Sequence, residues 1–306
     1  MKASGWLLDV YISGGRAVLW VKTDGGGAVK LWDRYLPDFY VKPRDDYGVE
    51  ELASVIQQHP NVVDAEVVEK YPRVSAEEKV KVVHVVVDGV GGFRRVLRDL
   101  EGLGLVGEWF NVDILHIQRY LISQQAAPTE RVEVDYSEDG MLRSLRLVDE
   151  GFKFEPPPFT PLIVQVDTEP NGCSVSKVWI FNDRLKPVVV LKGGEKAVLE
   201  GLAQVVSEGD PDILVASDPE RMFTHVLERA RHLEVRFRLS REGCSSGFYK
   251  GGLYTSGRAI ISLDYFQEYG VAGLSEKCSF ARLPPRLASK WPAGRIVDSR
   301  QCYEAV

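Results

Sequence analysis

The chain has 306 residues, which is enough for two domains of ordinary size. Its composition is that of a soluble globular protein, with 44% hydrophobic and 27% charged residues. It contains no run of eighteen apolar residues and no signal-peptide pattern after Met1, so we expect neither a membrane span nor a secretory leader. The net charge of −6 does not by itself indicate a nucleic-acid binder.

The cysteines are few and scattered, at positions Cys173, Cys244, Cys278 and Cys302. The absence of a C-x-x-C pair argues against a zinc site, and the scattered spacing argues against a disulfide framework. We therefore expect a reducing compartment and a cytoplasmic protein.

Arginines gather in two places, first at Arg94, Arg95 and Arg98 and then at Arg229, Arg231, Arg236, Arg238 and Arg241. The ordinary interpretation of such clusters is a solvated face, and we adopt it for both unless other evidence places them near nucleic acid.

The first half of the chain alternates between strand and helix patterns. Strands are predicted at 6–12, 17–22, 28–32, 38–43, 62–71 and 80–87, and helices at 48–59 and 91–102. Residues 111–123 are predicted as a helix or turn, and a hairpin is predicted around Gly140. Glycine-rich turns between short β-rich runs are typical of hairpins, and the whole pattern predicts an α+β domain.

The second half predicts a mixed sheet flanked by helices. Strands are expected at 161–169, 176–181, 188–191, 213–216 and 259–263, and helices at 195–208, 219–232 and from about 297. Three prolines at 156–158 cannot lie inside regular structure. We therefore divide the chain into an N-terminal domain at 1–130, a linker and hairpin region at 131–158, and a second domain at 159–306.

The apolar run Pro161–Val166 leads into Asp167 and Glu169, which are separated by one residue. Side chains alternate along a strand, so the two carboxylates point to the same face. Paired carboxylates can share Mg²⁺ or Mn²⁺, and two such ions about 3.5–4 Å apart are the usual arrangement for in-line attack on a phosphodiester. The ordinary alternative is that the D-x-E sequence opens a surface turn, because Pro170-Asn171-Gly172 follows at once.

The order of these elements and motifs resembles the N-terminal and 3′–5′ exonuclease domains of archaeal family-B DNA polymerases. The matching segments are Pro37-x-Phe39-Tyr40, Asp113-Ile114 with Arg119-Tyr120-Leu121, Asp167-Thr168-Glu169, Pro211–Val215, Gly257–Asp264, and Asp298 before Tyr303-Glu304. Nothing resembles the polymerase D-T-D or S-L-Y-P motifs, so this polypeptide alone is not expected to synthesise DNA.

The resemblance implies a ribonuclease-H-like α/β fold for the second domain, after the α+β first domain. It also implies that Asp167, Glu169 and Asp298 converge as catalytic residues and ligands of Mg²⁺ or Mn²⁺ if the site is active. The implied partners are single-stranded or primer-template DNA, and polymerase palm, fingers and thumb domains on the same or another chain. No membrane partner is implied.

Two positions depart from the family's exonuclease motifs. The second-motif aspartate is replaced by Phe223, and the tyrosine expected four residues before Asp298 is Gly294. Asp218 and Glu220 are weak substitutes, because acidic residues in a first helical turn ordinarily cap the helix and complement its dipole. The family's uracil pocket is also altered, as its matched positions include Pro37, Asp38 and His116.

A glycine-rich segment at 243–257 is expected to form an exposed hairpin or loop. It carries aromatic and basic residues that can stack on bases and contact phosphates, namely Phe248, Tyr249, Lys250 and Tyr254. A plain hairpin with exposed rings is an equally good interpretation. The functional prediction is a DNA-binding region with weakened or lost exonuclease activity. The alternatives are an active Mg²⁺-dependent 3′–5′ exonuclease and a non-catalytic interaction module of a replication or repair assembly.

Overall fold

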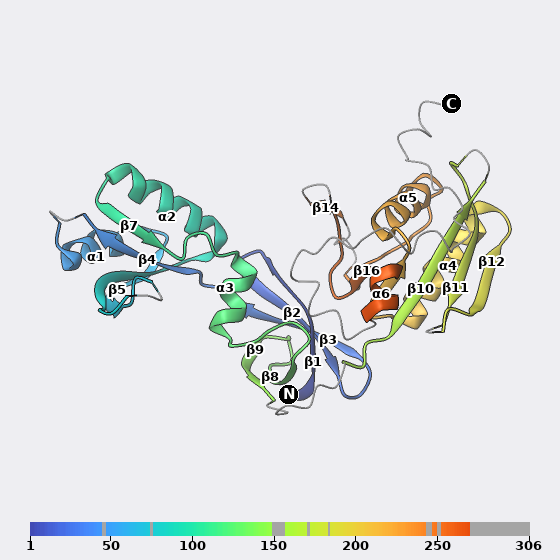
Figure 1. The fold of residues 1–306 in the computed structure, drawn as a ribbon, viewed down its shortest axis with the longest axis horizontal. Coiled ribbons are helices and arrows are strands. Elements are labelled where there is room, and N and C mark those ends of the chain that lie inside the picture. The colour runs from blue at the N-terminus through green and yellow to red at the C-terminus, as the bar shows by residue number, and fades with distance from the viewer. Residues whose placement is uncertain are drawn as a thin grey trace.

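A computed structural model describes residues 1–44, 47–73, 76–148, 157–169, 172–182, 184–242, 247–249 and 252–269. The molecule is elongated and contains three larger sheets, which lie one after another along its long axis (Figure 1). We call the central one sheet I, the one that carries α1 and α2 sheet II, and the one that carries α4 and α5 sheet III.

Sheet I is antiparallel, with strand order β3-β2-β1-β8-β9. Its strands are β1 (Lys2–Ser13), β2 (Arg16–Thr23), β3 (Ala28–Arg34), β8 (Arg131–Tyr136) and β9 (Leu142–Leu147). Gly14 and Gly15 form the β1–β2 turn with positive φ angles of 57° and 76°. The predicted hairpin around Gly140 is β8–β9, and β8 pairs directly with β1.

Sheet II is an antiparallel sheet of order β5-β6-β4-β7, with α1 and α2 packed on one face. Its elements are β4 (Asp38–Pro43), α1 (Val49–Gln57), β5 (Val62–Lys70), β6 (Val80–Val87), α2 (Gly89–Leu103) and β7 (Val106–Phe110). Phe39, Val83 and Val85 meet Leu52 and Phe93 in its core. The short edge strand β7 was not predicted, since its sequence has no clear alternation.

Helix α3 (His116–Ser123) returns the chain from sheet II to sheet I. Tyr120 packs in the core of sheet I, and its hydroxyl donates to Asp33 over 3.0 Å. Arg119 is buried and donates to the backbone oxygens of Asp38 and Asn111. This helix therefore fastens the start of β4 and the end of β7 to sheet I.

Sheet III is the predicted mixed sheet, of order β12-β11-β10-β13-β16. Its elements are β10 (Pro161–Thr168), β11 (Val175–Phe181), β12 (Pro187–Lys192), α4 (Glu195–Gly209), β13 (Ile213–Ala216), α5 (Pro219–His232), β16 (Ala259–Ser262) and α6 (Leu263–Tyr269). Strand β10, which carries Asp167, lies at the centre. The last predicted strand stops at Ser262, and α6 begins at Leu263 where no helix was predicted.

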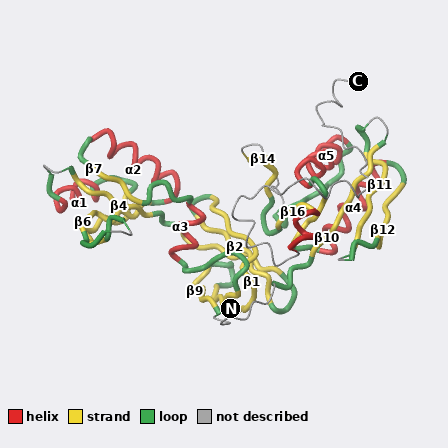
Figure 2. Tube along the Cα trace, in the orientation of Figure 1, coloured by secondary structure: helices red, strands yellow, loops and turns green. Residues whose placement is uncertain are grey.

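Helices α4 and α5 lie beside the strands of sheet III (Figure 2), and its two faces belong to different core clusters. Val164 and Val166 pack with α4 and α5, whereas Ile163 packs on the opposite face with residues of α6 and of sheet I. Alternation along β10 produces this division, because successive side chains point to opposite faces.

Sheets I and III share an apolar contact built around Trp20. Trp6 and Trp20 pack there with Phe159, Ile163 and Ile213. Gly257 has a φ of +70°, and a Cβ at this position would lie 2.7 Å from a ring carbon of Trp20. Only glycine fits this approach without displacing the indole.

An ionic network, buried except for Asp210, lies beside the same contact. The side chain of Asp212 is fully buried. It accepts three hydrogen bonds, each 2.8 Å long, from Lys22 Nζ of β2, from Arg241 and from the backbone N–H of Thr160. Arg258 donates to Asp210 over 2.7 Å and to the carbonyl oxygens of Pro211 and Leu239. We call these five charged side chains, Lys22, Asp210, Asp212, Arg241 and Arg258, the interface network.

Two further observations bear on the sequence predictions. In the part of the chain that the structure describes, no helix has both the length and the apolar character needed to cross a bilayer. Cys173 is disulfide-bonded, so the expectation drawn from the scattered spacing is wrong at this residue. The other three cysteines lie outside the described residues.

Removing the acceptor at the centre of the interface network should destabilise the protein strongly. We expect Asp212→Ala to cost about 3–5 kcal/mol, because it leaves the buried Lys22 without its counterion, whereas Arg241 keeps Asp210. Glu133→Ala is the matched control, since Glu133 pairs with Arg146 on the exposed side of sheet I. It should lower the free energy of unfolding by less than about 1 kcal/mol. Urea denaturation measures both, and similar midpoints for the two variants would contradict the prediction.

A second prediction concerns Asp9, which accepts the Gly257 backbone N–H over 2.8 Å. Burial raises the pKa of Asp9 to about 6. A carboxyl whose folded pKa is raised loses stability as pH rises from its unfolded pKa of about 4 up to the folded value. Asp9→Asn should therefore change the thermal midpoint little at pH 4. The increase in the midpoint should grow between pH 4 and pH 6 and stay constant at higher pH. A pH-independent difference would exclude this linkage.

Candidate nuclease site on sheet III

Asp167 lies near the end of β10, with both carboxylate oxygens engaged by neutral donors. Trp179 Nε1 donates to Oδ2 over 2.6 Å, and Gln165 Nε2 donates to Oδ1 over 3.1 Å. The pairing of β10 with β11 places Gln165 opposite Trp179, so the three side chains share one face of the sheet. Each oxygen accepts one of these hydrogen bonds, which orient the carboxylate on the sheet.

Glu169 follows the end of β10 and is exposed. Its backbone N–H donates to the Ser174 oxygen over 2.8 Å, and its own carbonyl accepts from Gly172 over 2.7 Å. The D-x-E sequence therefore does open a turn, as the ordinary interpretation predicted. The turn leaves the Glu169 carboxylate accessible beyond the strand end.

Phe223 is a core residue of sheet III. Its side chain is fully buried on α5, in the cluster that contains Val164, Val166 and Met222. These two valines point to the face of β10 opposite to Asp167. The side chain at position 223 is thus directed into the hydrophobic core, and an aspartate in this orientation would be buried among apolar groups.

Asp218 and Glu220 have structural partners at the start of α5. Asp218 is the N-cap residue, and its Oδ1 accepts from the Arg221 N–H over 3.3 Å. This confirms the capping interpretation. Glu220 Oε1 accepts from the Leu253 N–H over 3.2 Å, which fastens β15 to α5.

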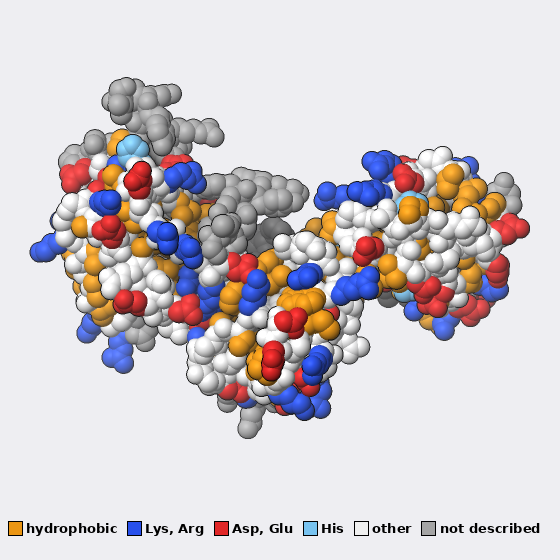
Figure 3. Space-filling view, turned by 180° about the vertical axis from the view of Figure 1, so that it is seen from behind, with side chains coloured by type: hydrophobic (Ala, Val, Ile, Leu, Met, Phe, Trp, Pro, Cys, Tyr) orange, Lys and Arg blue, Asp and Glu red, His pale blue; other side chains and the backbone are white. Residues whose placement is uncertain are grey.

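The second arginine cluster is partly structural rather than a solvated face, which corrects the sequence interpretation. Arg229 makes two hydrogen bonds to Glu195, over 2.8 and 2.6 Å, and Arg241 belongs to the interface network. His225 is buried nearby, and burial, reinforced by Arg229, lowers its pKa, so its ring is neutral at pH 7. On the face shown in Figure 3, basic and acidic side chains are interspersed.

The described residues do not fit a two-metal site. Among them, no three His, Cys, Asp or Glu side chains are placed to hold a metal ion. Asp167 and Glu169 are the two carboxylates available at the end of β10, and position 223 contributes a buried ring. Asp298 and Gly294 lie outside the described residues, so the convergence of Asp167, Glu169 and Asp298 stays a prediction.

The glycine-rich segment forms the predicted hairpin, with β14 (Gly247–Tyr249) antiparallel to β15 (Gly252–Tyr254). Lys250, like the side chains of Phe248, Tyr249 and Tyr254, lies outside the described part of the structure. Their contact with nucleic acid therefore stays a prediction.

The positions matched to the uracil pocket are engaged in contacts within the protein. Asp38 accepts a hydrogen bond from His84 over 2.9 Å and lies 3.5 Å from Arg119. His116 Nδ1 lies 2.8 Å from the Tyr35 hydroxyl. These contacts give both residues structural roles that sequence analysis did not anticipate.

Comparison with known proteins places these observations in a family context. No model of a known protein family matches the chain. The DNA polymerase of Pyrococcus horikoshii is 24% identical over 250 residues, which are 80% of this chain and 19% of that protein. DNA polymerase 2 of Aeropyrum pernix is 26% identical over 285 residues, covering 82% of this chain and 34% of that protein.

A solved structure is similar in fold. The family B DNA polymerase from Pyrobaculum calidifontis matches with a TM-score of 0.69 and 23% sequence identity, over 87% of this chain and 37% of that one. The chain thus spans well under half of the length of the relatives that it matches.

The position of Phe223 leads to a test of the core. We expect Phe223→Asp to destabilise the protein by at least the 3–5 kcal/mol or so that loss of a buried phenyl ring costs. The loss should grow with pH, because a buried carboxyl has a raised pKa. Phe223→Leu is the control and should cost less. Chemical denaturation at pH 5 and 8 measures both, and a stable, pH-insensitive Phe223→Asp protein would show that this side chain is not in the core.

Proposed function

Because its homologues are archaeal family-B DNA polymerases, we propose that this chain is the DNA-binding N-terminal and exonuclease-type region of such a polymerase, with 3′–5′ exonuclease activity weakened or lost. The observation that carries the loss is Phe223, fully buried where the motif requires a carboxylate. Trp179 and Gln165 each donate a hydrogen bond to the first-motif carboxylate of Asp167, which gives this side chain a role in holding the sheet.

The architecture supports the assignment of a ribonuclease-H-like second domain. A mixed five-stranded sheet carries the D-x-E sequence on its central strand, and α4 and α5 cover one face. We retain the division into 1–130, 131–158 and 159–306 as part of this proposal, with the β8–β9 hairpin paired to β1.

The arginines that remain exposed after α5 support DNA binding. In residues 235–239, Val235, Phe237 and Leu239 are buried, whereas Arg236 and Arg238 are exposed. This alternation anchors the segment through its apolar side chains and turns both guanidinium groups to solvent. Such a segment can contact successive phosphates of a single strand. The palm, fingers and thumb domains of a polymerase, on the same or another chain, would supply the remaining DNA contacts.

Two alternatives make different predictions. An active exonuclease needs a third carboxylate beside Asp167 and Glu169, and Asp298 is the candidate. A non-catalytic interaction module needs no DNA contact. The buried ring at position 223 weighs against the first alternative, and the exposed Arg236 and Arg238 weigh against the second.

Nuclease activity is tested by a time course on a 5′-labelled single-stranded oligonucleotide with Mg²⁺ or Mn²⁺. We expect no shortening above that given by Asp167→Ala, which controls for contaminating nucleases. Loss of one transition-state group alone costs about 10²–10³ in rate. Robust shortening that Asp167→Ala abolishes would establish the active exonuclease instead.

DNA binding is tested by titrating labelled single-stranded DNA at several salt concentrations. Each phosphate contact contributes about 0.7 to the slope of log affinity against log salt for single strands. Replacing both Arg236 and Arg238 by glutamine should therefore lower the slope by roughly 1.4. The matched control replaces Arg143 and Arg146, which are exposed on β9 of sheet I. Absence of binding by the unmodified protein would favour the interaction module.

A further inference from the structure

Among the described elements, no helix packs on one face of sheet II. Its order of elements is β4-α1-β5-β6-α2-β7, and both helices pack on the face that carries Phe39, Val41, Val83 and Val85. Alternation then assigns the opposite, open face a separate set of side chains, namely Asp38, Tyr40 and Lys42 of β4, Val80, Val82, His84 and Val86 of β6, Asp64, Glu66, Val68 and Lys70 of β5, and Glu108 and Phe110 of β7.

Aromatic rings line the centre and one end of this open face. Tyr40 lies across the β4–β7 pairing from Phe110, and its ring stacks on His84 with centroids 4.7 Å apart and planes inclined by 18°. Tyr71, which directly follows β5, is 58% exposed. A four-stranded sheet with aromatic side chains on an uncovered face is the arrangement by which single-stranded nucleic acid is commonly bound, with bases stacked on the rings.

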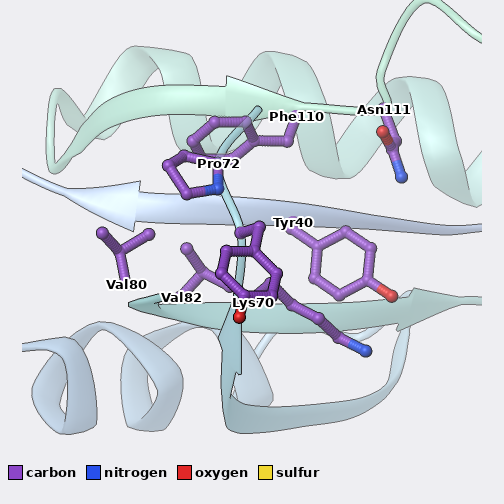
Figure 4. A pocket seen from close by; sticks show the side chains of 8 residues that line it. Tyr40, Lys70, Pro72, Val80, Val82, Phe110 and Asn111 are labelled. Atoms are coloured by element: carbon purple, nitrogen blue, oxygen red, sulfur yellow. The ribbon is translucent and has the colours of Figure 1, made fainter. Parts of the chain in front are cut away.

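These rings surround a small pocket (Figure 4). Its volume is about 230 Å³, and it is lined by Tyr40, Lys70, Tyr71, Pro72, Val80, Val82, Phe110 and Asn111. That volume is below the range of about 300–1,000 Å³ of pockets for drug-sized ligands, so it suits a single planar ring system. Its lining includes neither Pro37 nor His116, and the pocket is distinct from the positions matched to uracil recognition.

Polar groups lie on one side of this pocket. Figure 4 shows the Tyr40 hydroxyl, the Lys70 ammonium and the Asn111 amide extending toward the same side, while Val80 and Val82 supply apolar surface. An amide beside an aromatic slot can hydrogen-bond the edge of a base, because it offers both donors and an acceptor.

Two lysines border the pocket and can contact a phosphate. Lys70 Nζ lies 5.9 Å from the Tyr40 ring centroid, and Lys79 Nζ lies 5.6 Å from that of Tyr71. Neither lysine forms an ion pair with another described residue. Three acidic side chains of the same face have cationic or histidine partners, since Asp38 and Glu66 contact His84 and Glu108 contacts Lys42. Asp64 is exposed at the other end of the face, opposite Val86 and away from Lys70.

We propose that the open face of sheet II binds single-stranded DNA, with one unpaired base held against Tyr71 and Tyr40 in this pocket and the adjoining phosphates contacted by Lys70 and Lys79. This inference rests on the proposed DNA-binding function and assigns it a second surface, separate from the arginines that follow α5.

The test measures the affinity of the full chain for a labelled single-stranded oligodeoxynucleotide by fluorescence anisotropy. Tyr71→Ala should weaken binding by roughly 5- to 100-fold, the effect of removing a base-stacking ring, and Tyr71→Phe should restore most of it. Leu103→Ala is the control, because Leu103 is equally exposed at the end of α2, on the covered side of the sheet. Thermal unfolding of each variant verifies that the fold is retained.

A second pair of variants tests the phosphate contact. Lys70→Gln should lower the salt slope by about 0.7, whereas Lys81→Gln should not, since Lys81 points to the helix side and pairs with Glu50. Binding by the unmodified chain that is unaffected by Tyr71→Ala and Lys70→Gln would overturn this inference and leave the proposed function standing. No binding by the unmodified chain would overturn both. Tighter, Tyr71-dependent binding of RNA of the same sequence would overturn the assignment to DNA.

Discussion

The fully buried carboxylate of Asp212 is the interaction on which the rest of the structure depends. It lies immediately before β13 and accepts hydrogen bonds from sheet I through Lys22, from the chain before β10 through Thr160, and from the segment after α5 through Arg241. A buried carboxylate is stable only when its hydrogen-bonding capacity is filled. All three segments must therefore be in place together, which fixes β10 and β13 of sheet III against the N-terminal sheet.

The packing of sheet III also bears on its nuclease-like residues. Sheet I packs on the Ile163 face of β10, and the other face holds the core in which Phe223 lies. With Phe223 committed to that core and Asp167 hydrogen-bonded to Trp179 and Gln165, the described residues stabilise the fold at the positions where a nuclease would hold metal ions. The arginines of the second cluster fall into two groups. Arg229 and Arg241 hold elements together, and Arg236 and Arg238 remain available to a ligand.

Much of the fold could be predicted from the sequence, because hydrophobic periodicity and glycine turns mark most elements. The exceptions are β7, an edge strand without alternation, and α6, whose first residues look like the end of a strand. The site was harder to predict. Motif spacing identified Asp167 and the altered position of Phe223, and N-terminal capping was predicted for Asp218. Nothing local revealed that Trp179 and Gln165 would occupy the Asp167 carboxylate, or that Tyr40, Tyr71 and Phe110 would share a pocket, since strand register creates these contacts.

The central claim is that the carboxylate of Asp167 serves the fold instead of a pair of catalytic metals. The most direct measurement is a crystal structure of the protein grown or soaked with Mn²⁺, with the ions located by anomalous scattering. The account predicts that Trp179 and Gln165 keep their hydrogen bonds to Asp167 and that no metal pair forms at the end of β10. Two Mn²⁺ ions about 3.5–4 Å apart, with Asp167 as a shared ligand, would contradict it.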